Sequence, residues 1–286
     1  MKQQKVLLVG CGDIGIPLGL KLVEQGHLVW GVRRTIDSLP AEIQGMTADV
    51  TEAQSLSPLT QEDFDQVVIT LTPSQRSDEG YRSVYVEGVR NILQHLKGAP
   101  FIIYVSSTGV YHHSNGEWVD EACSAKPDSF SGKRLLEAEQ LLKADSFPFS
   151  VVRFSGIYGP GRNRLIEQVR SLKGVAKEPP VYTNRIHRDD CVGFILHLLN
   201  LQMEGKALEE LYLATDCEPT SMWEVKRFIA EQLSIAPNQL KPESIHQRKS
   251  KRLHNKKMRA TGYDLKYKNY KKGYGELIEK WLSNPS

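Results

Sequence analysis

A short apolar run that leads into three closely spaced glycines constrains the fold of this chain more than any other feature. The run Lys5–Val9 is followed by Gly10, Gly12 and Gly15, and helical periodicity then continues to Gln25. A strand, a glycine turn and a helix in this order open a βαβ unit, in which the turn and the helix N-terminus face a pyrophosphate. The pattern therefore predicts a dinucleotide-binding loop made of Gly10, Gly12, Asp13, Ile14 and Gly15.

The end of the second predicted strand indicates which dinucleotide is bound. That strand, residues 27–32, is followed by Arg33 and Arg34, and no acidic residue lies between Glu24 and Asp37. A carboxylate at this place would accept the ribose 2′-hydroxyl of NAD, whereas guanidinium groups suit the 2′-phosphate of NADP. The sequence therefore favours NADP(H), with NAD as the alternative cofactor.

The alternation of β-rich runs and helical stretches continues well beyond the glycine loop. Of the 286 residues, 40% are hydrophobic, which is enough for a full core. We therefore predict an α/β fold with a doubly wound parallel Rossmann sheet. The expected later strands are 66–71, 101–106, 150–154 and 211–214, and the expected later helices are 81–96, 133–143, 165–172, 191–199, 222–233 and 274–282.

Loops rich in Gly, Pro and Arg begin near Gly159, and the regular alternation of strands and helices ends there. We expect a Rossmann dinucleotide-binding domain over residues 1–160. Residues 161–286 should mainly form a smaller, interleaved α+β substrate lobe. The last strand, near 211–214, should return from this lobe to the Rossmann sheet.

The net charge of +3 conceals an uneven distribution. Residues 241–272 contain 12 Lys and Arg against Glu243 and Asp264, and the rest of the chain has 25 basic and 32 acidic residues. Such a basic stretch could meet an anionic substrate or an acidic partner, or it could be a solvated tail. No nucleic-acid-binding motif accompanies it, so we expect a small-molecule substrate and no nucleic acid.

The chain carries no sign of export, membrane insertion or metal binding. It has no run of 18 apolar residues and no signal-peptide pattern. Its four cysteines are not spaced as metal ligands or as a disulfide framework. We expect a cytoplasmic protein with no metal and with small buried thiols at Cys11, Cys123, Cys191 and Cys217.

Three further segments carry a family resemblance. They are Phe101–Tyr111 (FIIYVSSTGVY), Val152–Arg162 (VRFSGIYGPGR) and Asn184–Asp190 (NRIHRDD). With the glycine loop, they resemble signatures of the extended short-chain dehydrogenase/reductases, the NAD-dependent epimerase/dehydratase family. The resemblance covers roughly residues 5–212, and it implies NAD(P)-dependent oxidoreductase chemistry on a hydroxyl or keto group.

The resemblance also assigns roles to individual residues. Ser107 matches the catalytic Ser or Thr that hydrogen-bonds the reacting oxygen. Ser106 and Ser107 could instead cap the end of a strand, and His187 could be a structural histidine. The cofactor-contacting positions correspond to Asp49, Val50, Leu71, Thr72, Pro73, Ser106, Phe154, Ser155 and Ile157, and the substrate-holding positions to Arg162, Arg185 and His187.

The chain departs from the family at the catalytic tyrosine. The family uses Tyr-x-x-x-Lys, in which the lysine lowers the pKa of the phenol so that the phenol can exchange the substrate proton. Alignment on Glu137 makes Lys133 the lysine and puts Ser129 in the tyrosine's place, and a shift by one residue gives Phe130 and Arg134. Neither alignment supplies a phenol, which is similar to the atypical subgroup that lacks the Tyr/Lys pair. The nearby residues that could carry the proton instead are Tyr111, His112 and His113.

Two functions from different classes follow. The first is an NADP-dependent, epimerase-like oxidoreductase that acts on a sugar-nucleotide-like or other polar substrate, with Ser107, Lys133 and Tyr111 as catalytic candidates. The second is a non-catalytic protein that binds NADP(H) and changes its contacts with a regulatory partner. By analogy with the family, a homodimer formed through helices such as 81–96 is an option.

Overall fold

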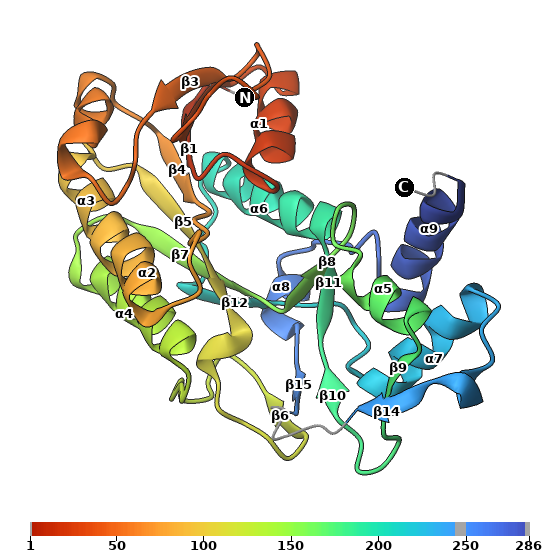
Figure 1. The fold of residues 1–286 in the computed structure, drawn as a ribbon. Helices are drawn as coiled ribbons and strands as arrows, with labels where there is room; N and C mark the ends of the chain where they lie inside the picture. Colours follow the sequence, from red (N-terminus) through yellow and green to blue (C-terminus); the bar gives the residue numbers. More distant parts are fainter. Residues whose placement is uncertain (1, 244–249, 284–286) are drawn as a thin grey trace. The chain divides into compact units, whose positions relative to one another are not determined.

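The computed structural model describes residues 2–243 and 250–283, and the chain forms two compact units. Unit 1 comprises residues 1–111, 124–153 and 192–212, and unit 2 comprises residues 112–123, 154–191 and 213–286. The boundary expected at residue 160 falls inside one segment of unit 2. The two units therefore alternate along the chain (Figure 1).

A seven-stranded sheet of the order β12-β7-β5-β4-β1-β2-β3 forms the centre of the fold. The pairs from β3 through β2, β1 and β4 to β5 are all parallel. From β1 the chain moves outward to β2 and β3, and then returns to β4 on the other side of β1. The switch point therefore lies beside β1, and the predicted doubly wound Rossmann sheet is confirmed. The strands are β1 (Lys5–Val9), β2 (Leu28–Arg33), β3 (Gln44–Thr47), β4 (Gln66–Ile69), β5 (Phe101–Ser107), β7 (Phe149–Phe154) and β12 (Leu211–Ala214).

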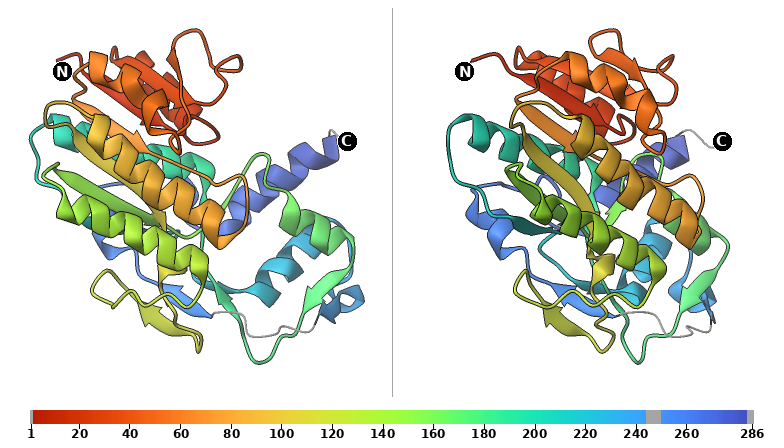
Figure 2. Two further views of the ribbon diagram at one scale, coloured as in Figure 1. Left: turned by 60° about the vertical axis from the view of Figure 1, so that its left-hand side comes forward. Right: turned by 90° about the vertical axis from the view of Figure 1, so that its left-hand side faces the viewer.

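Helices cover both faces of this sheet. α1 and α6 lie on one face, and the helices from α2 to α4 lie on the other (Figures 1 and 2). The central strands β1, β4 and β5 are accordingly almost wholly buried, as expected for parallel strands covered on both sides. The helical elements are α1 (Gly15–Glu24), η1 (Ala53–Gln61), α2 (Asp78–Tyr81), the π-helical η2 (Arg82–Glu87), α3 (Gly88–His95), η3 (Thr108–Val110), α4 (Phe130–Ala144) and α6 (Arg188–Met203).

Unit 2 is built from shorter elements. Within the described residues, its strands pair two by two: β10 with β13, β11 with β8, β14 with β9, and β15 with β6. Apolar side chains of β8, α5, α7 and α9 form its core. These elements are β6 (Glu117–Val119), β8 (Gly156–Tyr158), α5 (Arg164–Arg170), β9 (Lys173–Val175), β10 (Tyr182–Thr183), β11 (Arg185–His187), β13 (Thr220–Ser221), α7 (Met222–Gln232), η4 (Pro237–Gln239), β14 (Lys241–Glu243), β15 (Lys251–Leu253), α8 (Lys256–Ala260) and α9 (Tyr270–Ser283).

None of the helices in residues 2–243 and 250–283 is both long enough and apolar enough to cross a membrane. Cys11 and Cys191 are buried and Cys123 is half-buried, whereas Cys217 is exposed. The expectation of buried thiols is therefore wrong for Cys217.

Candidate functional site

The predicted dinucleotide loop lies between the ends of three strands of unit 1. The N–H groups of Gly10 and Cys11 both donate to the Val32 carbonyl at the end of β2, at 3.1 and 3.2 Å. On the other side, Thr70 Oγ1 after β4 donates to the Gly10 carbonyl at 2.8 Å. Gly10 has φ +85°, and a Cβ atom there would lie 2.7 Å from the Thr70 carbonyl oxygen. Only glycine fits at this position without strain.

The second glycine of the loop, Gly12, is surrounded by open space, in contrast to the tightly packed Gly10. A Cβ atom on Gly12 would meet only the Gly10 carbonyl oxygen, at 3.9 Å. The helix that follows begins at Gly15, so its N-terminus comes directly after the loop. Space beside the backbone, together with a helix N-terminus, suits the close approach of a pyrophosphate. Asp13 is exposed and Ile14 is buried beneath the loop.

Arg33 extends from the end of β2 back to this loop. Its Nη1 atom lies 3.5 Å from the Cys11 carbonyl oxygen, and the side chain is half-buried, whereas Arg34 is exposed. Burial raises the pKa of the Cys11 thiol to about 11, although the positive charge of Arg33 acts in the opposite direction. Cys11 is therefore a neutral packing residue. Of the two predicted arginines, Arg33 is the one that reaches the loop backbone.

The other cofactor-contacting residues of unit 1 occupy two turns after strands. Asp49 is half-buried, and its Oδ1 accepts the Thr51 N–H and the Thr51 hydroxyl at 3.0 and 2.8 Å. Val50 is buried against Gly88 of α3. Leu71 and Pro73 are half-buried after β4, and Thr72 is exposed. The Leu71 backbone lies directly beside the glycine loop, because a Cβ atom on Gly10 would be 3.2 Å from the Leu71 amide nitrogen.

The two serines at the end of β5 have different surroundings. Ser107 is half-buried, and its Oγ accepts the Gly109 N–H at 3.1 Å, so that it caps η3. Ser106 is 5% exposed, and its hydroxyl donates to Glu139 Oε1 at 2.6 Å. Only Ser107 therefore retains an accessible surface from which it could reach a bound molecule.

The N-terminus of α4 holds the residues that were aligned with the family's Tyr/Lys pair. Ser129 is the N-cap of this helix, and its Oγ accepts the Gly132 N–H at 3.2 Å. Lys133 is exposed. In the alternative alignment, Phe130 is partly exposed, and Arg134 forms ion pairs with Asp78 and Glu137 at 2.8 Å each. A serine that caps a helix does not replace a phenol as a general acid.

A chain of buried polar groups lies behind the β5 turn, and the sequence reasoning missed it. Glu139 of α4 and Arg153 of β7 form a two-pronged ion pair, from Nε to Oε1 at 2.9 Å and from Nη2 to Oε2 at 2.5 Å. Arg153 Nη1 donates to the Tyr111 hydroxyl at 2.6 Å. Tyr111 has no exposed surface, and Glu139 and Arg153 are 2% and 5% exposed. The chain thus contains a phenol beside a cation, but in a place that a substrate cannot reach.

The predicted residues of unit 2 are mostly internal. Phe154, Ser155, Arg185 and His187 are all at most 6% exposed, Ile157 is half-buried, and Arg162 is exposed. The His187 ring lies 3.8 Å from the Tyr267 ring, and its Nδ1 accepts the Asp189 N–H at 3.1 Å. Burial lowers the pKa of His187 to about 4, so this side chain is neutral at physiological pH. These contacts favour a structural role for His187. The two histidines proposed as proton carriers, His112 and His113, are exposed and half-buried respectively.

A second group of buried polar side chains lies in unit 2. Asp216 is 2% exposed, and its carboxylate accepts one N–H, from Glu218, at 3.3 Å. Burial raises its pKa to about 8, although the nearby charge of Arg185 acts against the shift. The Tyr158 hydroxyl has no hydrogen-bond partner among the described residues, and burial raises its pKa. Asp216 carried no signal in the sequence that would have marked it.

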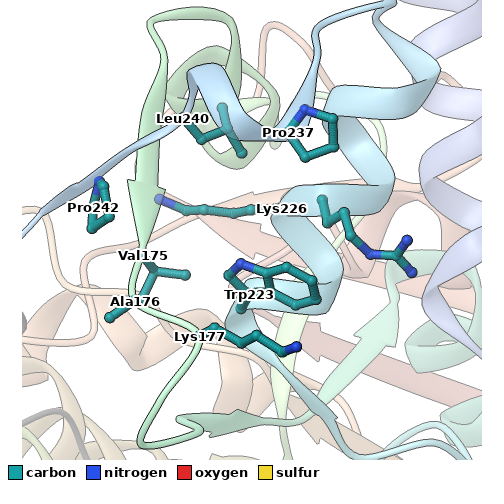
Figure 3. A pocket seen from close by; sticks show the side chains of 9 residues that line it. Val175, Ala176, Lys177, Trp223, Lys226, Pro237, Leu240 and Pro242 are labelled. Atoms are coloured by element: carbon teal, nitrogen blue, oxygen red, sulfur yellow. The ribbon is translucent and has the colours of Figure 1, made fainter.

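Unit 2 also contains a cavity of about 260 Å³ between α7 and the strands β9 and β14. None of the predicted site residues lines it. The Lys226 side chain runs from α7 toward β9, between Leu240 and Trp223 (Figure 3), and its Nζ donates to the carbonyls of Lys173 and Gly174 at 2.8 and 3.2 Å. Three lining residues are basic and none is acidic.

The basic stretch 241–272 is largely engaged within unit 2, as far as it is described. Lys268 pairs with Asp264 at 2.8 Å, and Lys266 pairs with Asp189 at 3.2 Å. The Arg252 guanidinium lies 4.9 Å from the ring centre of Trp118 and 4.8 Å from that of Tyr182. The described part of the stretch is thus folded into unit 2, although Lys266 and Lys268 keep exposed side chains. Within residues 2–243 and 250–283, no group of three His, Cys, Asp or Glu side chains is placed to hold a metal ion.

Known proteins resemble this chain over most of its length. Protein YeeZ of Escherichia coli K12 is 32% identical over 216 residues, which cover 71% of this chain and 75% of YeeZ. A Methylobacillus flagellatus structure described as an NAD-dependent epimerase/dehydratase is 37% identical, with a TM-score of 0.83 over 98% of this chain and all of that one. The fold is also shared by a UDP-glucose 4-epimerase from Thermotoga maritima, at 16% identity, with a TM-score of 0.80 over 98% of this chain and 99% of that one.

A family model gives the broadest match. The model of the RmlD substrate binding domain matches residues 4–283, and so includes both the glycine loop of unit 1 and the elements of unit 2. The resemblance to epimerase/dehydratases that the motifs indicated is thereby confirmed. The chain belongs to the RmlD substrate binding domain family.

Proposed function

We propose that this protein binds NADP(H) and uses it as an oxidoreductase on a hydroxyl or keto group of a sugar-nucleotide-like or other polar substrate. The observation that carries the proposal is the glycine loop, which is held in shape by Val32 and Thr70, with Arg33 directly alongside. The open space beside Gly12 is where the pyrophosphate would lie. The bound nicotinamide would supply the hydride, and the residues of this chain would bind and orient the cofactor and the substrate.

The preference for NADP over NAD depends on charge at the end of β2. Arg33 and Arg34 would pair with a 2′-phosphate, and a carboxylate that would repel it is missing from residues 25–36. Isothermal titration calorimetry with NADP(H) and NAD(H) tests this directly. The double variant Arg33→Ala with Arg34→Ala should lose the discrimination between the two. Arg227→Ala, which removes an arginine on α7 of unit 2, is the matched control and should retain it.

Retention of the NADP preference in the double variant, or equal affinities in the unaltered protein, would refute the 2′-phosphate assignment. A separate variant, Gly12→Val, should abolish the binding of both dinucleotides because its side chain would occupy the space for the pyrophosphate. Tight binding by this variant would show that the pyrophosphate lies elsewhere.

The burial of the two glutamates on α4 offers a further way to look for the proton-transfer group. Glu139 is the buried, paired glutamate of this helix, whereas Glu137 is half-exposed. Alignment of the family's catalytic helix on Glu139 puts Leu135 in the lysine's place and Ser131 in the tyrosine's place. This third alignment again provides no phenol. In this alignment Lys133 is not the lysine of the pair, whereas alignment on Glu137 keeps it there.

Ser107 is therefore the candidate that best fits a catalytic role in unit 1, because it is accessible and lies at the carboxyl end of a central strand. His112 remains a candidate for the proton carrier, because it is exposed and an imidazole can both accept and donate a proton. Tyr111 fits this role poorly because it has no exposed surface.

A second function, NADP(H) sensing without catalysis, is favoured by one observation: none of the three alignments of α4 supplies a phenol, and Ser129 is already used as a helix cap. A panel of carbonyl substrates assayed for NADPH oxidation separates the two functions. Turnover that is lost in Ser107→Ala would support the enzyme. Tight NADP(H) binding without turnover of any compound would support the sensor.

A further inference from the structure

The β5 turn that presents Ser107 is connected at both of its ends to one buried ion pair. On the N-terminal side, the Ser106 hydroxyl donates to Glu139 Oε1 at 2.6 Å. On the C-terminal side, the Tyr111 hydroxyl accepts from Arg153 Nη1 at 2.6 Å. Glu139 and Arg153 are joined to each other by two hydrogen bonds. Residues 106 and 111 are thus fixed to the same rigid pair, with the turn between them.

We propose that Glu139 and Arg153 are positioning residues that hold the 107–111 turn in a single conformation and thereby fix the direction of the Ser107 hydroxyl. The proposal rests on the proposed function only for what Ser107 does with a substrate. The mechanical claim, that the pair orders the turn, concerns unit 1 alone and is tested without any activity.

The local bonds of the turn would not fix it by themselves. Ser107 Oγ accepts the Gly109 N–H at 3.1 Å, and the Tyr111 N–H donates to the Thr108 carbonyl at 3.3 Å. Both bonds join residues within the segment 107–111, so they do not hold the segment to the rest of unit 1. A third contact comes from α4, because a Cβ atom on Gly132 would lie 2.7 Å from the Gly109 carbonyl oxygen. The helix that carries Glu139 therefore also touches the centre of the turn.

Directional bonding distinguishes this pair from an apolar alternative. A buried ion pair is a poor source of stability, because packed apolar side chains of similar size often stabilise a fold equally well or better. Apolar side chains, however, cannot fix the orientation of a serine hydroxyl and a phenol. Every charged group here has a directed partner, since both carboxylate oxygens accept and the guanidinium donates from Nε, Nη1 and Nη2. The charges of Glu139 and Arg153 are thus best explained by the fixed orientation that they give to Ser106 and Tyr111.

Tyr111 connects the end of the turn to the ion pair. Its ring is packed in the core with no exposed surface, and the Arg153 guanidinium lies 5.0 Å from the ring centre. Arg153 holds the Tyr111 side chain in place, and the Tyr111 side chain in turn holds the backbone at the end of the turn. This assigns Tyr111 a positioning role in place of the proton-transfer role that its place in the sequence suggested.

The test replaces the ion pair by apolar side chains and measures the turn by hydrogen–deuterium exchange. In the double variant Glu139→Leu with Arg153→Met, we expect the Gly109, Val110 and Tyr111 amides to exchange roughly tenfold faster or more, because the bonds that fix the turn are gone. Exchange in β1 and α1 should stay unchanged. The Gly109 amide is the most informative, because it donates to Ser107 Oγ itself.

The matched control is Glu137→Leu with Arg134→Met on the same helix. This pair is also an ion pair, at 2.8 Å, and Arg134 pairs with Asp78 as well; both partners lie outside residues 107–111. The control should leave the turn amides unchanged. If the Glu139/Arg153 double variant does not fold, Tyr111→Phe serves in its place, because it keeps the ion pair and removes the bond between Arg153 and the Tyr111 hydroxyl.

Unchanged exchange of the turn amides in a folded variant would overturn the proposal. Equally faster exchange throughout unit 1 would overturn it too, because this would show a role in global stability alone. Calorimetry with NADP(H) on the same samples separates the two proposals. If the unaltered protein does not bind the dinucleotide, the proposed function fails, whereas the exchange result still decides the positioning role.

Discussion

Both units bury arginines, carboxyl groups and tyrosines, but Arg153, Glu139 and Tyr111 of unit 1 are joined by hydrogen bonds, whereas Asp216 and Tyr158 of unit 2 are not bonded to each other. In unit 1, Glu139 accepts three hydrogen bonds, and Arg153 joins it to the Tyr111 hydroxyl. In unit 2, Asp216 accepts a single N–H at 3.3 Å, and the Tyr158 hydroxyl has no partner among the described residues. The groups are chemically alike, and their degree of burial is similar.

The difference shows that burial alone does not determine the charge of a group. A buried carboxylate keeps its charge when donors surround it, and becomes a neutral acid when they are too few. Arg153 retains a raised pKa despite the opposing effect of burial, because Glu139 holds the charged form. The pKa of Asp216 instead rises to about 8, because desolvation outweighs its single hydrogen bond and the charge of Arg185.

The largest effect should come from breaking the ion pair of unit 1 on one side only. Arg153→Met leaves the Glu139 carboxylate buried without its cation, and this should cost about 3–5 kcal/mol of unfolding free energy. Urea unfolding measures the loss. Adding Glu139→Leu to Arg153→Met should recover most of it, because the isolated charge is removed. A single variant that loses less than about 1 kcal/mol would contradict the view that the two groups compensate each other.

Removal of the titrating carboxyl in unit 2 should change how stability depends on pH. A folded-state pKa of about 8 means that folding favours the protonated acid, so the contribution of Asp216 is present at low pH and is lost as pH rises toward 8. The loss is at most about 1.4 kcal/mol per pH unit. Asp216→Asn should therefore be more stable than the unaltered protein at pH 8, and the gain should shrink as pH falls.

His187 defines the pH range in which this effect is best measured. Its lowered pKa of about 4 makes stability fall with acid below its ordinary value of 6.5, which opposes the slope from Asp216. Unfolding curves should thus be compared between pH 7 and pH 8, where His187 is neutral in both states and Asp216 still titrates. If the gain of Asp216→Asn is independent of pH there, Asp216 is ionised in the folded protein.

The smallest effects come from the two phenols, which form a matched pair. Tyr111→Phe leaves Arg153 Nη1 without this acceptor and should cost about 1–3 kcal/mol. Tyr158→Phe removes a buried hydroxyl that has no partner among the described residues, so it should leave stability unchanged or raise it, because an unpaired buried hydroxyl costs free energy. Thermal unfolding of both variants gives the comparison. Equal losses would mean that the two hydroxyls have equivalent surroundings.

The sequence predicted the sheet well because its signals are local. The apolar runs of β1, β4 and β5 are continuous, and the glycine spacing has one familiar structural outcome. The short strands of unit 2, such as β10 and β13, have two residues each and leave no periodic pattern. Their pairing depends on contacts between distant segments, which a single sequence does not reveal.

The candidate site was predictable in part for the same reason. Gly10 and Arg33 lie where the sequence pattern predicted them, next to the ends of β1 and β2. Ser106, Tyr111 and His187 were assigned from their place in a motif, and their actual surroundings depend on Glu139, Arg153 and Tyr267. Glu139 lies two residues after Glu137 on the same helix, and only packing distinguishes the buried acid from the half-exposed one.

The alternation of the two units along the chain has a consequence for biosynthesis. The chain passes from one unit to the other five times, and the last segment of unit 1 ends at residue 212. Neither unit can therefore be complete when the ribosome has made only the first half of the protein. A fragment that ends at residue 160 would lack α6 and β12, and so would leave part of one face of the sheet and the edge of β7 uncovered. Such a nascent chain would expose the edge of β7 until residues 211–214 have been made.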